Sequence, residues 1–176
     1  KEPDPSGSPS APNTGAGILS GKVIVIDPGH GGSNPGAVDN GTRESDNNLA
    51  VSLKLRDLLA QSGAKVVMTR SIDKTVAPEG SSLGQELQAR LDIADRNNAD
   101  IFVSVHTNSN SNADITGLTT YYPSGRSAAL AAAIKQNVIK TTNANDKGTL
   151  PATFYVLRNS AIPSSLVEMG FITNPG

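Results

Sequence analysis

Short apolar runs alternate with segments of helical periodicity from about residue 21 to the end of the chain. β-Branched residues dominate several of the apolar runs, which is typical of buried strands. Leucine and alanine recur every three or four positions in the segments between them, which predicts amphipathic helices. We expect strands over residues 22–27, 64–69, 100–106, 117–122, 153–158 and 165–168, and helices over 45–61, 83–94 and 127–140.

This alternation of strands and helices indicates an α/β fold. We expect a single domain over residues 21–176, with a largely parallel, twisted sheet of about six strands and helices on both faces. Residues 1–20 are rich in Pro, Gly and Ser and poor in apolar side chains. Such a composition favours a flexible linker or tail, and a linker suggests a further module before this domain.

The amino-acid composition restricts the possible partners and metal ligands of the chain more than it restricts its fold. The net charge is −1 with no block of like charge, so nucleic acid is not an expected partner. No apolar run reaches the roughly 20 residues of a transmembrane helix. The chain has no cysteine and two histidines. Any metal would therefore need histidine and carboxylate ligands.

Three of the predicted strands end in a side chain that can bind a metal or transfer a proton. The first strand runs into the turn that carries His30, the third ends at His106, and the last ends at Glu168. Ligands of open α/β sheets bind beyond the carboxyl ends of the strands, so parallel strands would bring these side chains together. The glycines around His30 would also let the backbone approach a ligand closely.

Each of these residues also has a structural explanation. His30 after a turn resembles an ordinary surface residue, and His106 could be a hydrogen-bonded core histidine. Glu44 could be a first-turn carboxylate that favours a helix N-terminus. Glu168 follows Leu166 and Val167, where an unpaired carboxylate is costly to bury, which favours a functional or paired role.

Five motifs follow one another along the chain: VIDPGHGG at 25–32, Arg43-Glu44 before a leucine-rich helix, Thr69-Arg70, SVHTN at 104–108 and LVEMGFITN at 166–174. In this order they resemble one family, the zinc-dependent N-acetylmuramoyl-L-alanine amidases that remodel bacterial cell walls. The resemblance extends from about Gly21 to the end of the chain.

The resemblance implies that His30, Glu44 and His106 hold one Zn²⁺, with Glu168 as the catalytic carboxylate beside the metal-bound water. Three protein ligands with an open position are typical of catalytic zinc. The implied substrate is peptidoglycan, cut between the lactyl group of N-acetylmuramic acid and L-alanine of the stem peptide. For Arg70, Arg90 and Arg158, which also fall at family-like positions, we expect structural ion pairing rather than substrate contact.

Two departures from the family pattern carry expectations of their own. Some members have a long helical insertion that blocks the zinc, whereas residues 108–117 here form a short polar loop. We therefore expect activity without an activator. Related domains usually continue into a final helix beyond Asn174, and a final C-terminal helix is expected to be missing from this chain. We also expect a monomer in the bacterial cell envelope, secreted, periplasmic or wall-associated.

Three other functions stay open at this point. A zinc peptidase that cuts within the stem peptide would use the same metal site and differ in its products. A non-catalytic wall-binding module would retain the fold without hydrolysis. A glycosidase would use Glu44 and Glu168 as paired carboxylates and would be indifferent to chelators.

Overall fold

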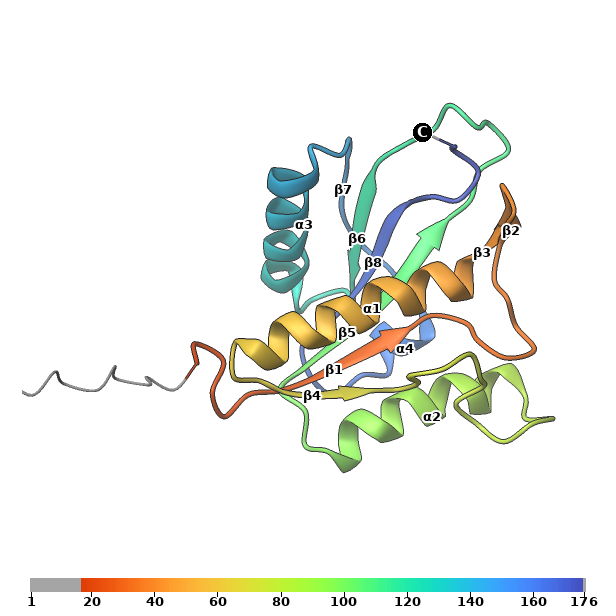
Figure 1. Cartoon of the computed structure of the whole chain (residues 1–176). Helices are drawn as coiled ribbons and strands as arrows, with labels where there is room; N and C mark the ends of the chain where they lie inside the picture. Colours follow the sequence, from red (N-terminus) through yellow and green to blue (C-terminus); the bar gives the residue numbers. More distant parts are fainter. Residues whose placement is uncertain (1–16, 176) are drawn as a thin grey trace, which may run out of the picture.

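The computed structural model describes residues 17–175, which fold around one six-stranded sheet (Figure 1). The strands lie in the order β4-β1-β5-β8-β6-β7, and a separate two-stranded hairpin pairs β2 with β3. The strands are β1 (Val23–Pro28), β2 (Val38–Asp39), β3 (Thr42–Arg43), β4 (Lys65–Met68), β5 (Ile101–Asn108), β6 (Leu118–Tyr122), β7 (Asp146–Pro151) and β8 (Ser164–Phe171). The helices are α1 (Glu44–Gln61), α2 (Leu83–Arg96), α3 (Ala128–Thr142) and α4 (Tyr155–Arg158).

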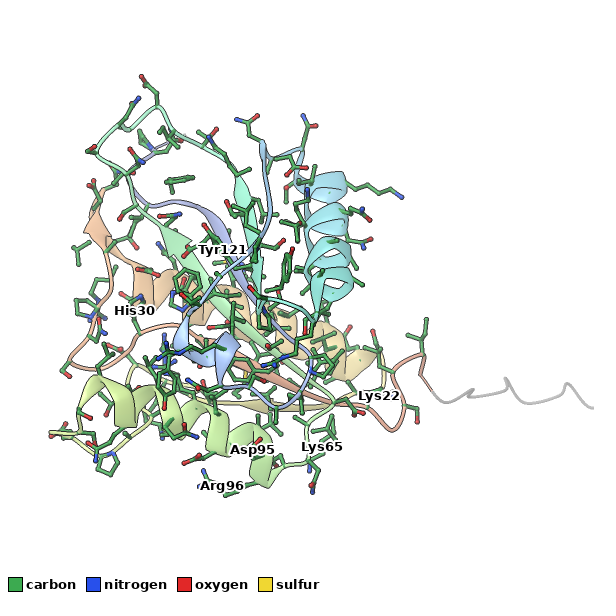
Figure 2. The ribbon with its side chains drawn as sticks, turned by 180° about the vertical axis from the view of Figure 1, so that it is seen from behind. Lys22, His30, Lys65, Asp95, Arg96 and Tyr121 are labelled. Carbon is green, nitrogen blue, oxygen red and sulfur yellow. The ribbon has the colours of Figure 1, made fainter. Side chains whose placement is uncertain are left out.

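Four neighbouring strands of the sheet are parallel. β1 pairs in parallel with β4 and β5, and β5 pairs in parallel with β8. β6 runs antiparallel to β8 and parallel to β7, so the last two strands reverse direction. The predicted α/β fold with a largely parallel, six-stranded sheet is confirmed. The parallel strands end at one edge of the sheet, and His30 lies at the opposite end of the molecule from Lys22 and Lys65, where β1 and β4 begin (Figure 2).

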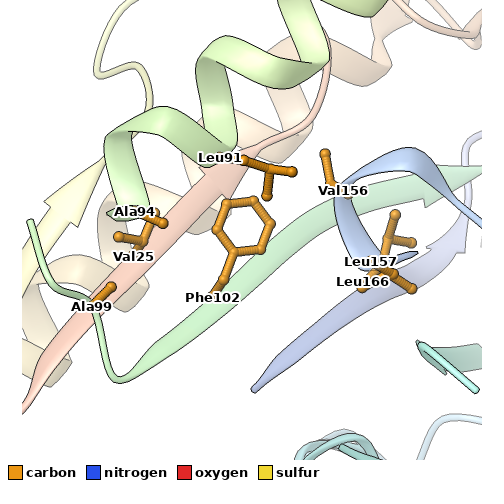
Figure 3. Close-up of a cluster of buried hydrophobic side chains, with 8 residues drawn as sticks. All are labelled: Val25, Leu91, Ala94, Ala99, Phe102, Val156, Leu157 and Leu166. Carbon is orange, nitrogen blue, oxygen red and sulfur yellow. The ribbon is translucent and has the colours of Figure 1, made fainter. Parts of the chain in front are cut away.

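Helices cover both faces of the sheet, as predicted. α1 packs on β1, β4 and β5, and α3 packs on β6, β7 and β8. α2 and α4 pack on each other across the opposite face, where α2 contacts β1 and α4 contacts β8. The main hydrophobic core lies under α2 and α4 (Figure 3). Its buried side chains are Val25, Leu91, Ala94, Ala99, Phe102, Val156, Leu157 and Leu166.

The alternation of side chains along β1 shows how the sheet separates the two layers. Val25 faces α2 in the core, so its neighbours Ile24 and Ile26 face α1 on the other side. α2 begins with a capping box, in which the Ser82 hydroxyl accepts from the Gln85 amide and the Gln85 side chain accepts from the Ser82 amide. These reciprocal hydrogen bonds fix the start of the helix close to the His30 turn.

One predicted strand is wrong, and the prediction missed one strand of the main sheet and the short hairpin of β2 and β3. Residues 153–158 were expected to form a strand, but the structure has a single helical turn, α4, whose Val156 and Leu157 are buried. Two adjacent buried side chains suit a helical turn packed on α2, whereas a strand would place them on opposite faces. The sixth strand is instead β7, Asp146–Pro151, an edge strand with a polar sequence and mostly exposed residues. Such a strand lacks the apolar run on which the prediction relied.

The first residues that the structure describes pack against the end of α1. Residues 1–16 of the expected linker lie outside the described residues, while residues 18–21 form a turn in which the Leu19 amide donates to the Ser62 carbonyl, 2.9 Å away, at the end of α1. Within residues 17–175, no helix is both long and apolar enough to cross a membrane.

Candidate metal centre

The structure brings together three side chains from distant parts of the sequence. His30 follows β1, Glu44 is the first residue of α1, and His106 lies near the end of β5. One donor atom from each lies within 4.8 Å of the others. The Glu44 Oε1 atom lies between the two rings, 3.1 Å from His30 Nε2 and 3.0 Å from His106 Nδ1. The sequence therefore identified a set of residues that converge at one point.

His30 is held in a strained turn. Its backbone has φ of 60°, a left-handed conformation that is uncommon for a residue other than glycine. Its Nδ1 atom lies 3.1 Å from the Asn34 side-chain oxygen, which leaves Nε2 directed at Glu44. The neighbouring position 29 requires glycine, because a Cβ there would lie 2.2 Å from the His106 ring. The glycine thus lets the two histidines meet, and their ring centroids are 5.0 Å apart.

Glu44 is buried and hydrogen-bonded on both carboxylate oxygens. Oε2 accepts from the Ala37 amide at 3.0 Å, and Oε1 accepts from the Thr107 amide at 3.3 Å. The Asn48 side chain donates to Oε1 as well, at 3.4 Å. Burial opposes ionisation, but hydrogen bonds from His106, His30 and Ala37 hold the pKa of Glu44 far below its ordinary value. The carboxylate is therefore ionised, oriented and placed at the N-terminus of α1, where the helix dipole favours a negative charge.

His30 responds to the same carboxylate in the opposite sense. Burial lowers the pKa of its imidazole, but the hydrogen bond and the negative charge of Glu44 outweigh burial, so the pKa of His30 is raised. The centre therefore attracts positive charge, and protons compete with any metal ion for its donors.

The donor set fits a divalent metal such as zinc. Two imidazole nitrogens and one carboxylate oxygen match the ligands of a catalytic zinc site and leave one position open. Donors at about 2.1 Å from a tetrahedral ion lie roughly 3.4 Å apart, close to the separations of 3.0 and 3.1 Å at Glu44 Oε1. Oε1 is the carboxylate oxygen that faces both histidine nitrogens, so it is the oxygen placed to bind an ion together with them.

Glu168 lies beside this centre on the next strand. The register of β5 and β8 pairs it with His106. Its Oε2 atom is buried and has no hydrogen-bond partner in the part of the chain that the structure describes. Burial raises the pKa of Glu168; the histidine charges act against this shift and the Glu44 charge adds to it. An unpaired carboxylate oxygen next to three converging donors is costly unless something else occupies the site.

Two buried arginines support the turn that carries His30, and only one of them forms the expected ion pairs. Arg90 bonds Asp27 at 2.7 Å and Glu86 at 2.8 Å, and donates to the carbonyl oxygen of His30 at 3.0 Å. Arg70 instead donates to backbone carbonyls. These acceptors include Gly29, before His30, and Ser45, after Glu44, so Arg70 joins the two ligand segments. Among residues 17–175 no carboxylate lies within ion-pair distance of Arg70. Arg158 is exposed, and its guanidinium lies 5.7 Å from the centre of the Tyr155 ring.

Sequence reasoning missed two buried polar residues near the centre. Asp27 accepts hydrogen bonds from Thr69, Ser104 and Arg90. Burial raises the pKa of Asp27, but the positive charge of Arg90 and these hydrogen bonds outweigh burial, so the pKa is lowered. Asn48 lies on α1 with no exposed surface. Both could have been noticed as polar residues inside otherwise apolar periodic segments, where burial requires a partner.

A small cavity opens beside the two histidines on the α2 face of the sheet. Its volume is about 150 Å³, and apolar side chains from α2, α4 and β8 form much of its wall. Tyr121 and Phe154 stack edge to face next to it, with ring centroids 5.2 Å apart. Figure 2 shows Tyr121 on this face, on the same side of the molecule as the α4 turn. The two histidines of the centre thus border a cavity whose wall is largely apolar.

Comparison with known proteins adds a family to this geometry. Residues 24–176 match the family described as N-acetylmuramoyl-L-alanine amidase. The uncharacterized protein YqiI of Bacillus subtilis strain 168 is 40% identical over 160 residues, 89% of this chain and 73% of YqiI. The amidase LytC of the same organism is 37% identical over 158 residues, which cover 88% of this chain and only 30% of LytC. The solved structure of the amidase AmiC2 of Nostoc punctiforme is similar, with a TM-score of 0.79 and 39% identity over 89% of this chain and 83% of that chain.

Proposed function

The chain belongs to the N-acetylmuramoyl-L-alanine amidase family, and from that premise we propose that it hydrolyses the lactyl–L-alanine amide of peptidoglycan at a zinc site formed by His30, Glu44 and His106. The observation that carries this proposal is the convergence of the three donors around Glu44 Oε1, beside an unpaired carboxylate of Glu168. When bound there, zinc would polarise the scissile carbonyl and lower the pKa of water.

The residues of the chain have separate tasks in this proposal. His30, Glu44 and His106 hold the ion, and Asn34 keeps the His30 ring oriented through the other ring nitrogen. Glu168 takes a proton from the attacking water and returns it to the amine of L-alanine as that amine leaves. Its Oε2 atom, which is buried and has no hydrogen-bond partner within residues 17–175, is the atom that we assign to this transfer.

The proposal includes activity without an activator protein. Residues 109–117, between β5 and β6, form bends and a turn, and Ser109, Asn112 and Asp114 are held by side-chain hydrogen bonds within this loop. These residues contain no helix that could cover the metal centre. The isolated chain should therefore release stem peptides from purified peptidoglycan without any other protein. Inactivity that is relieved by a partner would contradict this part of the proposal.

We further propose that the domain acts as a monomer in the bacterial cell envelope and is brought to the wall by an additional module. The net charge of −1 and the six aromatic residues offer little for steering toward, or stacking on, an anionic glycan. Loss of the other module would then weaken retention on the wall far more than it weakens turnover of small muropeptides. Sedimentation of the purified chain, and wall retention of a full-length protein with and without that module, would test these statements.

The experiment that tests the function identifies the products. The purified chain is incubated with peptidoglycan as isolated, with a chelator, and with the chelator followed by excess zinc. We expect stem peptides with a new N-terminal L-alanine, together with glycan that carries a free lactyl carboxyl group. The chelator should abolish their release, and zinc should restore it.

Other products would point to the other functions. Shortened stem peptides would indicate a zinc peptidase that uses the same centre. Cleaved glycan in the presence of the chelator would indicate a glycosidase. Absence of any product from folded, zinc-loaded protein would favour a wall-binding module and would contradict the proposal.

A further inference from the structure

Asn48 contacts all three segments that carry the proposed metal ligands. Its side-chain nitrogen donates to the Gly29 carbonyl, at 3.3 Å, immediately before His30. The same nitrogen donates to Glu44 Oε1, at 3.4 Å. Its side-chain oxygen accepts from the Thr107 hydroxyl, at 3.0 Å, immediately after His106. One amide therefore joins three parts of the chain that lie far apart in the sequence.

The orientation of this amide follows from its partners. A carbonyl oxygen and a carboxylate oxygen can only accept hydrogen bonds, so the nitrogen of Asn48 must face Gly29 and Glu44. The Thr107 hydroxyl can donate, so it suits the amide oxygen. No other orientation satisfies all three contacts, and the side chain of Asn48 is fully buried. The contacts therefore fix the amide in one orientation.

Glu44 needs contacts that fix its carboxylate, because the last side-chain torsion of glutamate, χ3, has no sharp energy minimum. Asn48 follows it by one turn of α1, so the two side chains meet on the same face of the helix. The Thr107 amide also donates to Glu44 Oε1, which means that Asn48 and Thr107 approach the same oxygen and each other. A shift of Asn48 would therefore remove one support of the carboxylate and one support of the end of β5 together.

We propose that Asn48 is the positioning residue of the metal centre, which sets the relative placement of His30, Glu44 and His106 and thereby the zinc affinity of the chain. It does not touch the ion; it acts through Glu44 and through the backbone beside the two histidines. The inference rests on the proposed zinc site. Partners in the outer shell of a metal site typically change metal affinity about 10- to 100-fold when they are mutated.

The test compares zinc affinity with the stability of the metal-free protein. Asn48→Leu removes all three contacts and keeps the branching and the number of side-chain heavy atoms, and Thr107→Val removes one of the contacts while keeping the Thr107 amide. Ser52→Ala is the matched control, because Ser52 is buried one turn further along α1 and its hydroxyl has no hydrogen-bond partner in the described part of the chain. Zinc dissociation constants come from competition with a chromogenic chelator, and unfolding of the metal-free variants comes from urea titration.

We expect a 10- to 100-fold loss of zinc affinity for Asn48→Leu and a smaller loss for Thr107→Val. Ser52→Ala should bind zinc as the wild type does. In the Asn48→Leu background, Thr107→Val should have little further effect, because the contact that it removes is already absent. The visible absorption of the cobalt-substituted protein should change for Asn48→Leu and stay unchanged for Ser52→Ala, since it reports the ligand geometry.

Zinc affinity of Asn48→Leu within twofold of the wild type would overturn the inference, and so would equal losses in Asn48→Leu and Ser52→Ala. If Asn48→Leu does not fold, Thr107→Val alone decides, because unchanged affinity and an unchanged cobalt spectrum would again refute the role. A wild-type chain that binds no zinc would refute the proposed function itself, which separates the two failures.

Discussion

The ion pair between Arg90 and Asp27 gives the clearest stability prediction. Their side chains are 4% and 1% exposed, so water cannot replace either partner, and the Nη1–Oδ1 distance is 2.7 Å. Asp27→Ala leaves the guanidinium with Glu86 and two backbone carbonyls but removes its fully buried counter-charge. Removal of one partner of a buried pair costs about 3–5 kcal/mol.

The hydroxyls of Thr69 and Ser104 also lose a carboxylate acceptor in this variant. Each of them lies 2.7 Å from an Asp27 carboxylate oxygen, and a buried polar group left without a partner costs about 1–3 kcal/mol. Glu86 still compensates part of the Arg90 charge, and Ser104 keeps the Asp27 carbonyl oxygen at 3.5 Å, so we expect a total loss of about 5 kcal/mol, the low end of the summed range. This is a large part of the roughly 5–15 kcal/mol that stabilises a typical domain.

Urea denaturation of the metal-free protein measures this loss, because bound zinc would add its own contribution to stability. Asp27→Asn keeps the shape and an acceptor, so it should lose less than Asp27→Ala. Asp57→Ala serves as a control at the exposed ion pair with Arg56, where we expect the midpoint to stay near the wild-type value. A loss below about 1 kcal/mol for Asp27→Ala would refute the reasoning, since it would fall in the range of a surface pair.

Two further predictions concern pH and the fit around Glu44. The pKa of Asp27 is lower in the folded chain than its ordinary value of 3.8, so the stabilisation from its carboxylate is present above that value and is lost as the pH falls through the folded pKa. Urea titrations below about pH 4 should therefore show a steeper loss of stability for the wild type than for Asp27→Asn. Parallel curves for the two proteins would contradict the assignment. Gly36→Ala should strain a backbone with φ of +67° and place a Cβ 2.5 Å from Glu44 Oε2, whereas Gly41→Ala strains a φ of +71° with no atom within 4 Å. Both variants should lose about 1–2 kcal/mol of stability. Chelator competition should show at least a tenfold loss of zinc affinity for Gly36→Ala alone. Equal zinc affinities of the two variants would argue against a tight fit at Glu44.

The sequence predicted the layers of the fold and the candidate residues at the strand ends for the same reason, whereas Glu44 was identified only by the resemblance to the family. Buried parallel strands show as apolar runs, and a polar residue at the end of such a run stands out, as His106 and Glu168 do. The polar edge strand β7 carries no such signal, and the apolar residues of α4 suit a strand as well as a single helical turn. These elements depend on packing against their neighbours.

The supporting residues of the centre were harder to predict than its ligands. Asn48 contacts Gly29 and Thr107, which are 19 and 59 positions away in the sequence. Arg70 donates to the backbone carbonyls of Gly29 and Ser45. Every residue has a backbone carbonyl, so the sequence does not indicate which carbonyls will accept these hydrogen bonds. A resemblance to a family identifies positions that bear chemistry, but only three-dimensional contacts show which side chains hold those positions in place.

The most direct test of the proposed mechanism is the rate at which zinc-loaded Glu168→Gln releases stem peptides from purified muropeptides, measured beside its zinc content. We expect one zinc per chain, as in the wild type, because Glu168 is not among the three proposed ligands. We expect the rate to fall by about 10²- to 10⁴-fold, because the amide can neither accept nor return the proton. A zinc-loaded Glu168→Gln protein that hydrolyses at the wild-type rate would contradict the proposed role of Glu168 and the mechanism built on it.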